Sequence, residues 1–247
     1  PCSTLFPYTL LFRSIWFDTA FQDKKDVRNQ EKMLKNLGHA LEYYERVLRL
    51  EPNNIYAANG GGAVLAQKGY LEFAKDIFTD VHEATAAEIS GGLADVWINL
   101  AHVYLGLEQY MNAVKMYQNC LRKFFYNNNV NVMLYLARTF YDFDKLHECK
   151  NVLLKALHMQ PSNYTLWFDL GVAMQQFAVK SLQNEAKRAA DVREAIRELN
   201  LAVKMFKYCF SFGDKVIKYG FDMTKTKVHL KFCQSMLETG NKHLKYA

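Results

Sequence analysis

The sequence predicts an all-α protein, a solenoid of antiparallel helix pairs. Only four prolines occur in 247 residues, and no segment alternates apolar and polar residues as a half-buried strand does. Apolar residues instead recur three and four positions apart, which places them on one face of a helix. A small residue also returns at nearly constant intervals, which indicates that one structural unit is repeated.

The segment DVWINLAHVYLGLEQYMNAVKMYQNCLRK, residues 95–123, predicts two helices joined by a turn at Glu108-Gln109. Ala101 and Ala113 are expected where the two helices cross. A larger side chain there would push the helix axes beyond the usual separation of about 8–10 Å. Three aromatic residues fill the space around this crossing: Trp97, Tyr104 and Tyr117.

The small residue of each second helix measures the length of the unit. These residues are 34, 39 and 36 positions apart: Ala40, Ala74, Ala113 and Cys149. The first helices agree, because their leucines are 36 and 34 positions apart: Leu100, Leu136 and Leu170. The interval of 39 predicts five inserted residues in the segment HEATAAEISGGLA.

Two prolines mark the ends of second helices. The residues before Pro52 and Pro161 disfavour the helical backbone region, so a helix is expected to end there. Asn53-Asn54 and Ser162-Asn163 follow these prolines and offer side-chain oxygens that cap the next helix.

This unit resembles the tetratricopeptide repeat, a helix–turn–helix of about 34 residues. The pattern W-x2-L-G-x2-Y, followed by small, aromatic and small residues and then Pro, is matched in several units. One unit matches it with Trp97, Leu100, Ala101, Tyr104, Ala113, Tyr117 and Cys120, and another with Trp167, Leu170, Gly171 and Met174. An earlier unit departs from it, with Ala58, Gly61 and Gly62 at the tryptophan, leucine and glycine positions. The resemblance implies stacked helix pairs whose first helices line a concave surface.

Three parts of the chain are expected. Residues 1–14 contain TLFPYTLLFRS, which resembles a translated sequencing adapter, and are interpreted as an artefact. Residues 15–180 contain the repeats, with about five first helices that begin with a remnant at 15–21. Residues 181–247 contain a lengthened last helix pair and a capping helix. The capping helix is expected to turn four apolar side chains inward: Val228, Phe232, Met236 and Leu237.

The C-terminal part is basic. Residues 181–247 contain thirteen Lys or Arg against seven Asp or Glu, whereas residues 1–180 are balanced. The candidate basic patch consists of Arg193, Arg197, Lys204 and Lys207. Such a patch fits an acidic partner or a nucleic-acid backbone. The alternative is a solvated helix face, because acidic residues are interspersed.

No catalytic set is visible, and the sequence predicts a protein that is not an enzyme. His147-Glu148-Cys149 is interpreted as packing, because Cys149 holds the small-residue position of its unit. The glycines at 60–62 lack the Lys-Ser/Thr of a phosphate-binding loop. Cys120, Cys149 and Cys209 are expected to be buried thiols. No cofactor, metal, small-molecule substrate or membrane partner is expected, and no run reaches the roughly 20 apolar residues of a membrane span.

Recognition of another protein is the function that these features favour. The outward positions of the first helices combine aromatic and polar side chains, the residue types of binding hot spots. These candidates are Asn99, His102, Tyr135, Arg138, Phe168 and Gln175. Alternatively, neighbouring helices or the C-terminal segment cover them.

A closer resemblance rests on three stretches: residues 54–70, 95–124 and 134–163. They resemble the repeat-scaffold subunits of the RNA polymerase II-associated factor complex. That resemblance implies an internal fragment of a non-enzymatic nuclear scaffold that holds other subunits of a transcription elongation complex. It implies support for elongation and histone modification, with RNA polymerase II or chromatin contacted indirectly. The alternatives are a generic tetratricopeptide adaptor, such as a co-chaperone, and a nucleic-acid-contacting module in the basic C-terminal helices.

Overall fold

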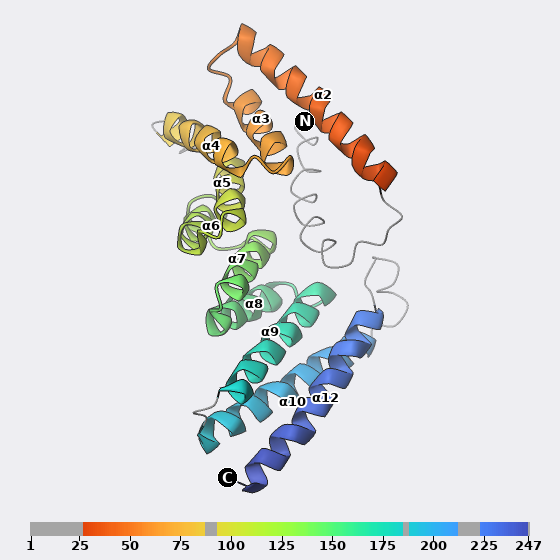
Figure 1. Ribbon diagram of the computed structural model, residues 1–247. Helices are drawn as coiled ribbons and strands as arrows, with labels where there is room; N and C mark the ends of the chain where they lie inside the picture. The colour runs from red at the N-terminus through yellow and green to blue at the C-terminus, as the bar shows by residue number, and fades with distance from the viewer. Residues whose placement is uncertain (1–26, 87–92, 185–187, 212–222, 247) are drawn as a thin grey trace. The chain divides into compact units, whose positions relative to one another are not determined.

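The described part of the chain is helical apart from its connecting turns. The computed structural model describes residues 27–86, 93–184, 188–211 and 223–246. These residues form ten helices and no strand (Figure 1). Successive helices pair in antiparallel fashion, so the predicted all-α class of a tetratricopeptide-repeat solenoid is confirmed. The expected artefact at 1–14 and the remnant helix at 15–21 lie outside the described residues.

The first compact unit extends to Met116. Its helices are α2 (Val27–Leu50), α3 (Ile55–Gln67), α4 (Leu71–Ala86), α5 (Ala94–Gly106) and the start of α6 (Tyr110–Phe125). Each helix from α2 to α4 packs against the next one along the chain. Their shared core contains Phe78 of α4 and Leu100 and Val103 of α5.

The second compact unit begins at Tyr117, within α6. It continues through α7 (Val130–Asp142), α8 (Leu146–Met159), α9 (Tyr164–Gln183), α10 (Ala189–Ser211) and α12 (Met223–Tyr246). Helices α9 and α10 contain 20 and 23 residues, whereas α3 contains 13 and α4 contains 16. Helix α10 packs along both α9 and α12.

Small residues lie where the helices cross. Ala74, Ala113 and Ala202 are 0% exposed, and Cys149 is 2% exposed. On the facing first helices the close contact is made by a glycine or an alanine. A Cβ added to Gly171 of α9 would lie 2.8 Å from a ring carbon of Phe206 in α10, and one added to Gly62 of α3 would lie 2.9 Å from Phe78 in α4. The absence of a side chain at these two glycines therefore lets the paired helices approach closely.

The turns inside the helix pairs share one backbone conformation. Gly69, Glu108 and Asp144 follow the first helices α3, α5 and α7, and all three have positive φ, at 90°, 59° and 62°. In each turn the next residue donates its N–H to a carbonyl five positions earlier, as Gln109 does to Tyr104 at 2.8 Å. Such a left-handed residue ends a helix and satisfies a carbonyl of its last turn. The polar break expected at Glu108-Gln109 is this turn.

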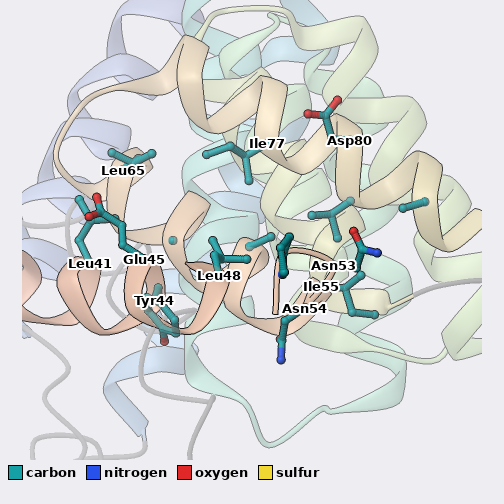
Figure 2. Close-up of a pocket in the computed structure, with 15 residues that line it drawn as sticks. Leu41, Tyr44, Glu45, Leu48, Asn53, Asn54, Ile55, Leu65, Ile77 and Asp80 are labelled. Carbon is teal, nitrogen blue, oxygen red and sulfur yellow. The ribbon is translucent and has the colours of Figure 1, made fainter. Parts of the chain in front are cut away.

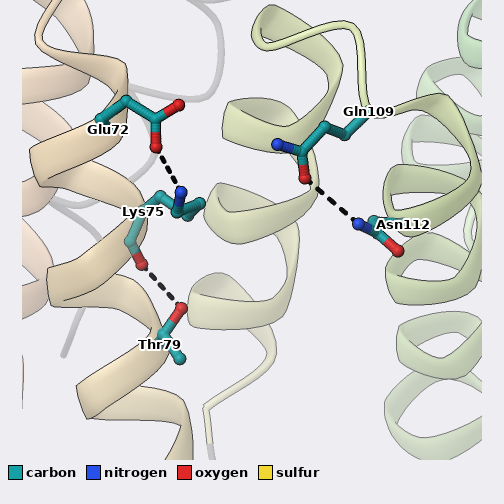
Figure 3. Close-up of polar contacts among 5 residues, drawn as sticks. All are labelled: Glu72, Lys75, Thr79, Gln109 and Asn112. Carbon is teal, nitrogen blue, oxygen red and sulfur yellow. Dashed lines mark hydrogen bonds and ion pairs between the residues drawn. The ribbon is translucent and has the colours of Figure 1, made fainter.

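Side chains fix the starts of several helices. The oxygens of Asn54 and Asn163 accept hydrogen bonds from the N–H groups of Ala57 at 3.0 Å and Thr165 at 3.1 Å, which confirms both predicted caps. Helices α2 and α8 end before Pro52 and Pro161, as predicted. Other polar contacts lie near the starts of α4 and α6 (Figure 3). They are the Lys75–Glu72 ion pair, the hydrogen bond from the Thr79 hydroxyl to the Lys75 carbonyl, and the Asn112–Gln109 amide contact.

The inward face of α12 differs from the prediction. Val228 is 62% exposed and Phe232 is 42% exposed, so the expectation that they point inward is wrong. Met236 and Leu237 are partly buried. Small and polar residues face α9 and α10 instead: Thr226, His229, Cys233 and Gly240. The reason is the close approach of α12, since a Cβ added to Gly240 would lie only 3.1 Å from Ile196.

Candidate protein-binding surfaces

Two of the predicted partner-binding residues belong to the first unit, and one of them is buried. Asn99 of α5 is partly buried and donates its amide to Asn59 of α3 at 3.0 Å. His102 is only 6% exposed, so the prediction that it points outward is wrong. The reason is that α5 is buried on most of its circumference, including Ile98 and Leu105 one turn to either side of His102. His102 therefore offers little surface to a partner.

Burial also makes His102 a source of pH-dependent stability. It lowers the pKa of His102 from 6.5 to about 4, so the folded unit holds a neutral imidazole. The unfolded chain takes up a proton near pH 6.5. The contribution of His102 to the free energy of unfolding is therefore fully present above pH 6.5. It is lost as the pH falls toward 4, by at most about 1.4 kcal/mol per pH unit.

Urea unfolding at several pH values across this window tests the expectation. The variant His102→Gln should lose this part of the pH dependence, whereas His147→Gln, at an exposed position, should retain it. An unchanged slope in His102→Gln would assign the pH dependence to another group.

The other four predicted residues lie in the second unit, and most of them contact neighbouring helices. The ring of Tyr135 lies 6.1 Å from that of Tyr117. Phe168 contacts the rings of Phe206 and His229, at 5.8 and 5.4 Å. The oxygen of Gln175 lies 3.0 Å from Nδ1 of His229 and 3.4 Å from Sγ of Cys233. Helix α12 thus covers part of the face of α9 that the sequence assigns to a partner.

Arg138 is the most accessible of the predicted residues. Its side chain is 43% exposed, and its Nε donates to Asp142 at 2.8 Å, one turn later on α7. The guanidinium group also lies over the ring of Tyr141, 5.9 Å from its centre. These contacts hold the side chain in one orientation and leave part of it available to another molecule.

The predicted basic patch forms a stripe on α10. Arg193, Arg197, Lys204 and Lys207 are all exposed, and their spacing places them on one helical face over about 21 Å. None of the four forms an ion pair with a residue of the described ranges. The acidic residues of α10 lie on other faces, and Glu198 is buried in an ion pair with Lys150 at 2.5 Å. We call these four residues the basic stripe.

The described cysteines are buried. Cys120, Cys149 and Cys209 are at most 2% exposed, as predicted. Burial raises the pKa of Cys149 to about 12 and that of Cys209 to about 11. No group of His, Cys, Asp and Glu in the described residues could hold a metal ion. None of the described helices has both the length and the apolar character needed to cross a bilayer.

One surface of the first unit was missed by sequence reasoning. An open groove of about 610 Å³ lies between α2, α3 and α4, as Figure 2 shows. One face of each helix lines it, including Leu41 and Leu48 of α2, Leu65 of α3 and Ile77 of α4. Two carboxylates, Glu45 and Asp80, stand beside this apolar lining. We call this surface the α2–α4 groove.

The sequence contains a partial indication of this groove. Leu41, Tyr44 and Leu48 recur at helical spacing, which predicts an apolar face on α2. The same spacing is expected of a helix whose apolar face is fully covered. Whether that face is covered depends on how α2, α3 and α4 pack, and periodicity within one segment does not specify this.

Fold and repeat together define the class of protein. Residues 94–122 match the family described as tetratricopeptide repeat, and they coincide with the pair α5 and α6. A solved structure named "Crystal structure of MamA protein" is similar with a TM-score of 0.55 and 14% sequence identity. The similarity covers 87% of this chain and 97% of that one. The chain therefore contains a tetratricopeptide repeat at residues 94–122 and has the paired-helix fold of tetratricopeptide-repeat structures.

The sequence comparisons are more specific. The chain is 42% identical over 237 residues to "Protein CTR9 homolog" of Arabidopsis thaliana, which covers 96% of this chain and 21% of the relative. It is 34% identical over 210 residues to "RNA polymerase-associated protein CTR9" of Caenorhabditis elegans, which covers 85% of this chain and 18% of that protein. The chain is thus homologous, over most of its length, to one segment of CTR9 proteins and spans about a fifth of their length.

Proposed function

We propose that the chain is a non-enzymatic, protein-binding part of a scaffold in an RNA polymerase-associated complex. The proposal rests on the 42% identity with the CTR9 homolog over 96% of this chain. Its partners would be other subunits of a transcription elongation complex, through which RNA polymerase II or chromatin is contacted indirectly. The function would be support of elongation and histone modification in the nucleus.

Paired helices suit this role physically. A rigid array of helices offers side chains at fixed positions without ordering a loop, so little conformational entropy is lost when a partner binds. A few aromatic and arginine side chains then supply most of the binding energy. In the second unit, Arg138 and the partly buried Tyr135 on α7 are candidates for such contacts.

Affinity purification tests the proposal. The tagged chain, added to nuclear extract, is expected to recover subunits of an elongation complex. Arg138→Glu should reduce this recovery, whereas Lys155→Glu, an exposed substitution on the second helix α8, should not. Recovery of chaperones in place of elongation subunits would favour the generic adaptor, and no specific recovery would count against both.

The basic stripe favours a second candidate function, binding to a nucleic-acid backbone. These four cations lie on one helical face and form no ion pair within the described ranges, so they can neutralise about four phosphates and release their counterions. The affinity for duplex DNA should then fall with salt, with a log–log slope of about −3 to −4.

Triple charge reversal of Arg193, Arg197 and Lys204 to Glu should abolish this binding. The matched control reverses three exposed lysines on other helices: Lys35, Lys115 and Lys155. Fluorescence anisotropy with labelled DNA distinguishes the two variants. Equal losses in both would indicate only a non-specific effect of net charge.

A further inference from the structure

We propose that the α2–α4 groove binds an amphipathic helix of a partner protein, with apolar side chains inward and Lys or Arg beside Glu45 and Asp80. This inference rests on the proposed scaffold function and specifies the chemistry of one partner. The groove lies wholly within the first unit, between helices that are adjacent along the chain. The outward positions of α7 and the basic stripe on α10 belong to the second unit.

The apolar lining provides the driving force. Leu41, Leu48, Leu65 and Ile77 are only partly buried, although they point toward one groove from three helices (Figure 2). Apolar surface that remains in water favours a ligand that covers it, by about 25 cal/mol for each Å² removed from water. The volume of about 610 Å³ is large enough for several apolar side chains.

The walls favour a helix over an extended peptide. They are helices, whose backbone N–H and C=O groups are already bonded within the helix. The amide side chain of Asn54 is also engaged, because it caps Ala57 and donates to Glu51 at 2.9 Å. An extended segment would find few partners there for its backbone groups. A helix satisfies its own backbone and needs only an apolar face, as in other helix-in-groove complexes.

The charges favour a basic partner. Glu45 of α2 and Asp80 of α4 line the groove from different helices, and its lining residues in the described part of the chain include no Lys or Arg. Asp80 is exposed and makes no ion pair with a described residue, while Glu45 lies 3.9 Å from Arg49 of its own helix. Complementary charge of this kind selects among partners and orients them.

Gly61 provides a way to fill the groove. It lies on the lining in the middle of α3, and a Cβ added there would meet only the Cβ of Tyr44, at 3.8 Å. A Cβ can therefore be added there without a clash, and Gly61→Leu extends an apolar side chain from the groove lining and removes a helix-destabilising glycine. Gly38→Leu is the matched control, because Gly38 lies on α2 outside the groove lining with open space around it.

The test measures binding of a labelled peptide of leucine and lysine, about four helical turns long, to the whole chain by fluorescence anisotropy. The leucines follow helical spacing in the probe and are shuffled in a control peptide of the same composition. The unchanged chain and Gly38→Leu are expected to bind the probe and to discriminate against the shuffled peptide. Gly61→Leu should weaken binding at least about tenfold.

A second variant tests the charges. The double substitution Glu45→Lys and Asp80→Lys should weaken binding of the leucine–lysine peptide about threefold or more and strengthen binding of a leucine–glutamate peptide. Absence of binding to the unchanged chain, equal binding of the shuffled peptide, or binding unaffected by Gly61→Leu overturns the proposal. If elongation-complex subunits are still recovered from nuclear extract in that case, the scaffold function stands and only the groove inference fails.

Discussion

Replacing Phe206 by alanine is expected to destabilise the second unit by about 3–5 kcal/mol. The ring is 0% exposed and lies against the rings of Phe168 and His229, 5.8 and 5.6 Å away between centres. It also fills the space opposite Gly171, so it joins α9, α10 and α12 at one point. These long helices surround the ring and cannot all collapse into the cavity that alanine leaves.

Phe232→Ala is the matched control for Phe206→Ala. It removes the same atoms from α12 in the same unit, but Phe232 is 42% exposed and should cost less than about 1 kcal/mol. Urea unfolding gives both free energies, and hydrogen exchange should show the loss of protection in α9, α10 and α12. Equal losses of stability in the two variants would contradict the assigned core.

Gly62→Ala and Gly38→Ala are expected to change stability in opposite directions. At Gly62 the new methyl group would lie 2.9 Å from the ring of Phe78, which is 1% exposed and cannot move aside. Overpacking of this kind typically costs about 1–3 kcal/mol. At Gly38 no atom lies within 4 Å of the added Cβ, so the better helix propensity of alanine should stabilise the unit by about 0.5–1 kcal/mol.

Thermal and urea unfolding of the two variants measure this difference directly. Both glycines lie inside helices of the first unit, so backbone propensity alone would stabilise both variants alike. Stabilisation by Gly62→Ala would show that α3 and α4 are not in the close contact described here. Destabilisation by Gly38→Ala would show that another part of the protein packs against α2 at Gly38, where the structure has open space.

The repeated fold could be predicted from the sequence because the residues that form each helix pair recur at the length of the repeat unit. Ala74, Ala113 and Cys149 recur at the length of the unit, since each crossing needs one small residue. The caps at Asn54 and Asn163 are predictable because asparagine is a favoured N-cap residue and both follow a proline that ends the preceding helix.

Features that depend on contacts between helices were harder to predict. The sequence pattern predicts that Val228 and Phe232 point inward, because apolar residues on one helical face are normally buried. The close packing of α12 instead requires Thr226, Cys233 and Gly240 at the contact. His102 was placed on an outer face because helical spacing in one segment does not show that neighbours cover most of α5. The α2–α4 groove was missed for a related reason, since it is formed by three helices together.

A segment exchange tests most directly whether this chain is part of the scaffold. In the Arabidopsis CTR9 homolog, this chain replaces the segment that aligns with it over 237 residues. The exchanged protein is then purified from nuclei. We expect elongation-complex subunits to co-purify with both the unaltered homologue and the exchanged protein, and to be lost when the segment is deleted. A folded exchange protein that loses those subunits, or a deletion that retains them, would contradict the proposed function.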